Sequence, residues 1–336
     1  MTTLLTTPGP VIDVHTHAIP DAWAQHLEAS GVTFGHDDDQ IVVRRHGRVV
    51  RVVPRVGWEG AARLAAMDEL GVDVHVVSPP PFLYLYDVDG GLGAECCRAV
   101  NEAVLHMTSA SPQRLLALGV LPMQEPSRAV EEIEWLAAAG FRGIAIGAEI
   151  NGELPGSDRF LPVLEAAEAL SMVVFVHPRE ESVDPALEPV GLGFGLGFPS
   201  ATGTAAAHLA WSGVLDRLPR LQVLLAHGGG TLPALIGRLA TGWERLPGRA
   251  GRLETHPRQA LGRFWADSLT YDPDVLRLTA TVFGEGHLLL GSDFPFAARE
   301  EPLGDALQRA VASGSLSSGA LAAVAGENAK RLFATD

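Results

Sequence analysis

Cysteine, lysine and long apolar runs are scarce in this chain of 336 residues. The only two cysteines, Cys96 and Cys97, are neighbours, so they provide neither a disulfide framework nor a zinc site built on thiolates. This usage predicts a reducing compartment, hence the cytoplasm. No apolar run approaches the ~20 residues of a membrane span. The first ten residues lack the basic start and long apolar centre of a secretory signal, so we expect a loose lead-in.

Positive charge is also scarce. Lysine and arginine total 25 against 40 aspartates and glutamates, which gives a formal net charge of −15. Nucleic acids and anionic membranes both require basic patches, so the balance argues against either as the main partner. Lys330 is the only lysine, and an anionic small-molecule substrate would therefore have to be bound by arginine. The 47% hydrophobic and 19% charged content is ordinary for a soluble enzyme.

Segments with strand-like and helical patterns of apolar residues alternate along the chain. Strand-like segments begin at eight positions, namely Val11, Val72, Leu116, Gly143, Met172, Leu221, Phe264 and His287. Helical spacing separates most of them, as in Gly60–Leu70, Thr204–Asp216 and Leu232–Trp243. Such alternation implies right-handed βαβ units and a parallel sheet. Eight units favour a closed (β/α)8 TIM barrel forming a single domain over residues 1–336, with a doubly wound sheet as the alternative.

One stretch interrupts the alternation. Residues 21–58 contain two β-rich runs, Ile41–Arg45 and Val49–Val53, on either side of His46-Gly47-Arg48. Two such runs around a glycine-containing turn are typical of a β-hairpin. The pattern predicts a small β excursion inserted after the first strand.

Five polar residues lie where apolar strands end. His15 and His17 end the first strand, His177 the fifth, His227 the sixth and Asp293 the eighth. Residues two apart on a strand leave the same face, and the carboxyl ends of barrel strands meet on one face of the fold. Each residue alone has a simpler explanation, such as a polar strand face, a loop or a turn cap. Together they indicate a site for zinc, manganese or ferrous iron.

The same residues belong to longer motifs. These are Asp-Val-His-Thr-His at 13–17, Val-His-Pro at 176–178, Ala-His-Gly-Gly-Gly at 226–230 and Gly-Ser-Asp-Phe-Pro at 291–295. They resemble the amidohydrolase superfamily, and more narrowly its branch of metal-dependent decarboxylases that includes aminocarboxymuconate semialdehyde decarboxylase. Trp58, residues 119–124 and the surroundings of Arg238 also follow this pattern. The resemblance covers nearly the whole chain.

The resemblance implies one divalent metal ion, usually zinc, with manganese or ferrous iron as alternatives. Its ligands would be His15, His17, His177 and Asp293, together with a water molecule. His227 would be the acid/base residue beside that water, so that His227 and Asp293 form the catalytic pair. Binuclear relatives usually bridge two metals with a lysine at the end of strand four, and residues 143–149 contain no lysine. A single metal follows, unless Glu149 acts as a bridge.

The resemblance also implies substrate-binding residues. Arg51 and Arg238 match two arginines that bind substrate carboxylates, with Arg238 donated across a homodimer interface. Without the resemblance, Arg51 would be interpreted as a solvated hairpin residue and Arg238 as a helix-surface charge. Residues 191–198 are glycine-rich and we expect them to form a lid. Phe194 or Phe198 in this lid, and Phe296 near Asp293, are predicted to face the substrate.

The sequence therefore predicts a mononuclear metal-dependent decarboxylase of a small unsaturated or aromatic carboxylic acid, in which His227 activates the metal-bound water. The first alternative is a hydrolase or hydratase of a lactone or amide on the same scaffold. The second is an iron-dependent oxygenase of a biosynthetic pathway. A non-enzymatic binding protein is disfavoured, because folding does not require five such residues at strand ends.

Overall fold

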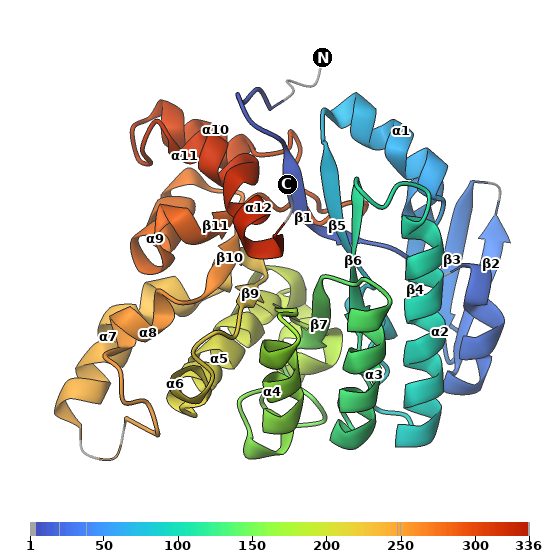
Figure 1. The fold of residues 1–336 in the computed structure, drawn as a ribbon, viewed down its shortest axis with the longest axis horizontal. Coiled ribbons are helices and arrows are strands. Elements are labelled where there is room, and N and C mark those ends of the chain that lie inside the picture. Colours follow the sequence, from blue (N-terminus) through green and yellow to red (C-terminus); the bar gives the residue numbers. More distant parts are fainter. Residues whose placement is uncertain (1–4, 20, 38, 247, 249, 335–336) are drawn as a thin grey trace.

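Eight parallel strands surround the centre of the molecule in their order along the chain (Figure 1). The computed structural model describes residues 5–334 except 20, 38, 247 and 249. The strands of this sheet are β1 (Ile12–His17), β5 (Val74–Ser78), β6 (Leu115–Val120), β7 (Gly143–Gly147), β8 (Val173–His177), β9 (Val223–Leu225), β10 (Trp265–Asp267) and β11 (Leu288–Leu289). All eight lie within a few residues of the predicted positions.

The two edges of this sheet come together through the residues that follow β11. The backbone N–H of Val14 in β1 donates to the carbonyl of Leu290 at 2.9 Å, and the N–H of Asp293 donates to the carbonyl of His15 at 2.8 Å. These bonds close the sheet into a barrel, which confirms the (β/α)8 prediction over the doubly wound alternative. They also bring Asp293 against the end of β1.

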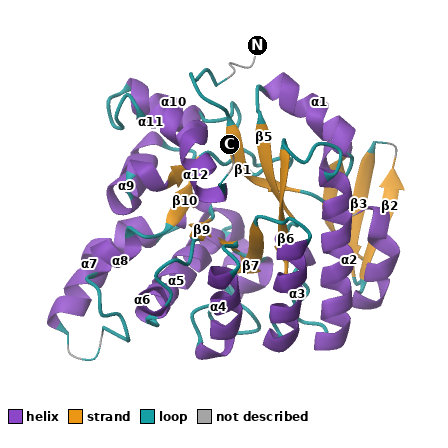
Figure 2. Cartoon of the chain, viewed as in Figure 1, coloured by secondary structure: helices purple, strands orange, loops and turns teal. Residues whose placement is uncertain are grey.

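Helices cover the outside of the strands (Figure 2). They are α1 (Gly60–Leu70), α2 (Gly90–Thr108), α3 (Pro126–Ala138), α4 (Leu161–Ala169), α5 (Phe198–Trp211), α6 (Val214–Arg217), α7 (Leu232–Arg245), α8 (Pro257–Leu261), α9 (Pro273–Phe283), α10 (Asp305–Ala312), α11 (Ala320–Ala322) and α12 (Asn328–Phe333). Among the described residues, none of these helices has the length and apolar character needed to cross a membrane.

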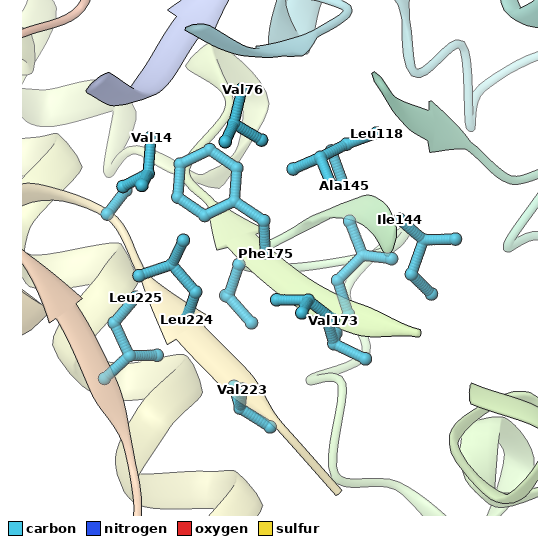
Figure 3. Close-up of a cluster of buried hydrophobic side chains, with 14 of the residues drawn as sticks. Val14, Val76, Leu118, Ile144, Ala145, Val173, Phe175, Val223, Leu224 and Leu225 are labelled. Atoms are coloured by element: carbon cyan, nitrogen blue, oxygen red, sulfur yellow. The ribbon is translucent and has the colours of Figure 1, made fainter. Parts of the chain in front are cut away.

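Apolar side chains from several strands fill the core (Figure 3). Val14, Val76, Leu118, Ala145 and Phe175 come from five different strands and are almost fully buried. Burying one such side chain stabilises the folded state by roughly 1.5–3 kcal/mol, and this gain favours the convergence of the strands. Val173 and Phe175 share a face of β8 with His177, because residues two apart point the same way. The apolar core therefore leads directly to the histidine at the strand end.

The predicted excursion is a three-stranded antiparallel sheet rather than a two-stranded hairpin. It contains β2 (Val32–Asp37), β3 (Gln40–Arg45) and β4 (Arg48–Pro54). His46 and Gly47 connect β3 to β4 with φ angles of 48° and 79°, as a two-residue type I′ turn requires. The strand β2 lacks clear apolar alternation, which is why its sequence did not predict it. In the view of Figure 1 this sheet lies at the right, outside the ring of barrel strands.

One predicted helix needs correction, and two short helical segments were not predicted. The helix predicted over Thr204–Asp216 instead begins at Phe198 and breaks into α5 and α6 at Gly213, whose φ of 78° is left-handed. A π-helical turn over Gly193–Gly197 precedes α5, so the glycine-rich stretch is partly helical. The short helix α8 was not predicted, because five residues show too little periodicity.

Candidate metal centre

Four predicted metal ligands meet at the carboxyl ends of the barrel strands. His15 and His17 end β1, His177 ends β8, and Asp293 follows β11. One donor atom from each lies within 4.8 Å of the others. The Nε2 atoms of His15 and His177 are 3.1 Å apart, and the Nε2 of His17 is 3.1 Å from Oδ1 of Asp293. The barrel thus gathers three imidazoles and a carboxylate from opposite ends of the sequence.

The hydrogen bonds of the three histidines orient their Nε2 atoms toward one another. The Nδ1 of His15 lies 2.7 Å from Oδ2 of Asp267, that of His177 lies 2.7 Å from the carbonyl of Pro178, and that of His17 lies 3.2 Å from Oγ of Ser78. Each Nδ1 therefore donates its proton outward, which leaves an Nε2 lone pair directed inward. Such outer partners fix the tautomer that a metal requires.

This arrangement fits a divalent cation. Two inward lone pairs 3.1 Å apart, on His15 and His177, repel each other unless a positive charge lies between them. Within the described part of the chain, the buried Nε2 of His17 has no hydrogen-bond partner. Burial lowers the pKa of His17 and holds that of His177 well below its ordinary value. Both rings are therefore neutral, the form that binds metal.

The carboxylate ligand is held in its charged form. Burial raises the pKa of Asp293, but the close contact with His17 and the other nearby imidazoles outweigh that effect, and the net pKa is lowered. Its backbone has a φ of 71°, and that of His227 has a φ of 56°. A left-handed backbone is costly for residues with a side chain and often occurs at functional sites. Both predicted catalytic residues have this feature.

His227 lies at the edge of the metal-ligand group. Its ring centroid is 5.1 Å from that of His177, and the ring stacks at 8° on Phe198 with centroids 6.5 Å apart. Burial lowers the pKa of His227 to about 4, so the ring is neutral near pH 7. Among the described residues its buried Nδ1 has no hydrogen-bond partner. A neutral, unpaired ring nitrogen is available to exchange a proton with a small molecule in the pocket.

The turn after His227 requires glycine. A Cβ on Gly230, whose φ is 61°, would lie 2.0 Å from the carbonyl oxygen of Pro199. The close approach brings the start of α5, and with it Phe198, against the turn that carries His227. The Ala-His-Gly-Gly-Gly motif thus has a steric reason beyond its resemblance to other sequences.

Sequence reasoning missed Asp267, which ends β10. This fully buried carboxylate accepts a hydrogen bond from Nδ1 of His15, and also from the backbone N–H groups of His227 at 2.9 Å and Gly228 at 2.8 Å. It therefore connects a metal ligand to the turn that carries His227. Its position at the carboxyl end of a strand was the same signal that identified the other ligands. The signal was weak, because the strand Phe264–Ser268 is short.

Replacing Asp267 with asparagine is expected to weaken metal binding by about 10–100-fold, the usual cost of losing such an outer partner. The amide has only one acceptor oxygen, and its NH2 group would face donors that the carboxylate now accepts from. Titration against a chromophoric chelator measures the affinity. Asp274→Asn, at an exposed aspartate on α9, is the matched control. Unchanged metal affinity in Asp267→Asn would contradict this role.

A pocket of about 340 Å³ opens beside the metal-ligand group. It is lined by residues that were predicted to contact the substrate, namely Arg51, Phe296 and both candidates of the lid, Phe194 and Phe198, and also by His227. The guanidinium carbon of Arg51 lies 5.9 Å from the centre of the Phe296 ring. The Phe296 ring is in turn 5.2 Å from the ring of His17. Arg51 is thus separated from a metal ligand by a single aromatic ring.

Two other predicted residues lie elsewhere. Arg238, on α7, lines a shallow depression with Leu235, Leu239 and Leu246, and is not among the described residues that line the pocket of its own chain. The carboxylate of Glu149 accepts a hydrogen bond from the N–H of Gly152 and is not part of the ligand group found among the described residues. The geometry therefore gives no support to a second metal at Glu149.

Comparisons with known proteins identify the family of this chain and several similar proteins. Residues 12–335 match the family described as Amidohydrolase. A 2-amino-3-carboxymuconate-6-semialdehyde decarboxylase of Dictyostelium discoideum is 30% identical over 301 residues, which are 88% of this chain and 82% of that protein. The crystal structure of 5-carboxyvanillate decarboxylase from Sphingomonas paucimobilis is 25% identical, with a TM-score of 0.76 over 97% of this chain and 99% of its own. The apo structure of IDCase from Metarhizium anisopliae shares the fold, with 23% identity and a TM-score of 0.81 over 99% of each chain.

Proposed function

Because this chain belongs to the amidohydrolase family, we propose that it is a mononuclear metal-dependent decarboxylase of a small aromatic or conjugated unsaturated carboxylic acid. One observation supports this most directly. The pocket beside the three imidazoles and one carboxylate in metal-binding arrangement also contains an arginine and several aromatic rings. Relatives that share most of the chain's length are decarboxylases by name.

Each group has a role in this reaction. A divalent ion held by His15, His17, His177 and Asp293 would supply Lewis acidity and acidify a water molecule. Arg51 binds a carboxylate of the substrate, because a guanidinium matches that group in charge and shape. The phenylalanines pack on the planar part of the substrate and exclude water. His227 transfers a proton to the carbon that loses carbon dioxide, so that a C–C bond breaks and a C–H bond replaces it.

We infer that the native metal is zinc. Three imidazoles and one carboxylate match the donors that zinc accepts, although manganese and ferrous iron accept the same types. Metal analysis of the purified chain tests this inference.

We also infer a homodimer, in which Arg238 reaches the neighbouring site. Arg238 lies beside the exposed side chains of Leu235 on α7 and Leu246 directly after it, which gives this surface an apolar character suited to association. Sedimentation of the intact chain measures the assembly.

The buried free thiols of Cys96 and Cys97 fit a reducing compartment, and we therefore expect a cytoplasmic protein.

The metal-loaded chain should release carbon dioxide from members of a panel of hydroxybenzoates and muconate-type acids. The control panel contains lactones and amides of similar size. Cleavage of a lactone or amide without carbon dioxide release would establish the hydrolase alternative instead. Carboxylates that bind but are not consumed would leave the pocket assignment intact and reject decarboxylation.

A further inference from the structure

The segment that follows β8 carries two glutamates that pair with arginines of the small sheet. Glu180 and Glu181 lie in a short helical turn three and four residues after His177. Arg51 on β4 pairs with Glu180 at 3.0 Å between Nη2 and Oε1, and Arg45 on β3 pairs with Glu181 at 2.9 Å. All four side chains line the pocket beside the metal-ligand group. The arginine predicted to bind substrate therefore already holds a carboxylate of its own chain.

The two ion pairs are built differently. The side chain of Arg45 is 13% exposed and contacts both Asp87 and Glu181, and Glu181 also pairs with Arg179 at 3.1 Å. Several partners and partial burial tie Arg45 into the protein. The pair of Arg51 with Glu180 is more open, with 38% and 54% of the side chains exposed. An exposed single pair stabilises the fold very little, so it opens at low cost.

Arg51 can therefore exchange partners without disturbing the fold. It is anchored by a hydrogen bond from Nη1 to the carbonyl of Val50 at 2.8 Å, while Nη2 faces Glu180. The same guanidinium lies over Phe296, on the side of the pocket nearest His17. A carboxylate that enters the pocket therefore approaches the same guanidinium of Arg51 that pairs with Glu180. The incoming anion and Glu180 cannot both pair closely with one NH2 group without repelling each other.

We propose that Glu180 is an internal competitor for Arg51 and thereby sets the affinity of the site for carboxylates. The inference deepens the proposed function and depends on its carboxylate substrate. Binding of the substrate carboxylate displaces Glu180 toward solvent, and release of the product restores the ion pair. Glu181 does not take part in this exchange, because Arg45 and Arg179 hold it. Glu180 is thus a specificity-determining residue that does not touch the reacting carbon.

Benzoate binding to the metal-loaded chain, measured by calorimetry, tests this proposal. Glu180→Gln keeps the shape of the side chain and removes its charge. We expect the Kd for benzoate to fall by about two- to fivefold, the range that corresponds to an exposed ion pair. In a decarboxylation assay, KM should fall by a similar factor while kcat changes little.

Two controls separate competition from a general effect of charge. Glu188 is an exposed glutamate further along the same connection, and Glu188→Gln should leave the Kd unchanged. In an Arg51→Gln background, Glu180→Gln should no longer tighten binding, because the partner in dispute is absent. The proposal is overturned if Glu180→Gln binds benzoate no more tightly than the parent, including no measurable binding by either. It is also overturned if Glu188→Gln gives the same gain or the gain persists without Arg51.

Failure of this proposal is distinguishable from failure of the proposed function. Benzoate binding requires no turnover, so tighter binding by Glu180→Gln without any carbon dioxide release would reject only decarboxylation. Carbon dioxide release with no response to Glu180→Gln would reject only the competition.

Discussion

Alanine in place of Asp293 is expected to reduce carbon dioxide release by about 10³-fold or more, because a metal contributes several kcal/mol to such reactions. Asp293 is the only carboxylate in the described ligand group. Its removal leaves three imidazoles, and no anionic ligand, to hold a dication. The metal content of the purified variant should fall together with the rate. Removal of the metal from the parent chain by a chelator should have the same effect.

The control for this experiment uses metal addition. Activity should return when zinc is restored to the chelated parent, and should remain low in Asp293→Ala at the same metal concentration. Asp274→Ala removes an equal charge from the exposed surface of α9 and should behave as the parent does. Full turnover by metal-free protein would refute the assigned role of the ligand group.

Glutamine in place of His227 is expected to reduce kcat by about 10²–10⁴-fold, the usual contribution of a positioned acid/base group. Metal content should stay near that of the parent, because His227 is not one of the four grouped ligands. Glutamine can still fill the space against Phe198, but it cannot exchange a proton at neutral pH. The measurement is single-turnover carbon dioxide release together with metal analysis of the same sample.

The combination of results distinguishes proton transfer from ligation. Loss of rate with retained metal assigns His227 to proton transfer, whereas loss of both would make it a fifth ligand. His26→Gln, at an exposed histidine that is not part of the metal-ligand group, controls for the substitution itself. His227→Glu is unsuitable for this comparison, because a new carboxylate beside His177 would create another metal ligand. Unchanged kcat in His227→Gln would reject the acid/base role.

The ligand group could be predicted because its members sit at strand ends. His15 and His17 follow an apolar run directly, and so does His177, so local patterning located them without knowledge of contacts. The barrel prediction then placed all carboxyl ends on one face. Asp267 carries the same positional signal on a strand of three residues, which was too short to stand out. Short strands are held by their neighbours rather than by their own propensity.

The ion pairs across the pocket could not be predicted. Arg45 and Glu181 are separated by 136 residues, and Arg51 and Glu180 also come from distant parts of the chain, namely β4 and the turn after β8. Their pairing depends on where the small sheet lies against the barrel, and one strand of that sheet, β2, was itself not predicted. Surface charges carry no periodicity that reveals a partner. The sequence could therefore identify Arg51 as a candidate but not the carboxylate that competes for it.

Apolar periodicity and the residues that terminate each strand were enough to predict the barrel and the chemistry at its carboxyl-terminal face. Both signals are local, because each depends only on residues that are consecutive in the sequence. Tertiary structure alone decided which nitrogen of each histidine faces inward, that Asp267 holds His15 and the turn of His227 together, and which glutamate reaches Arg51. These features depend on distances between elements remote along the chain. Only the folded packing sets those distances.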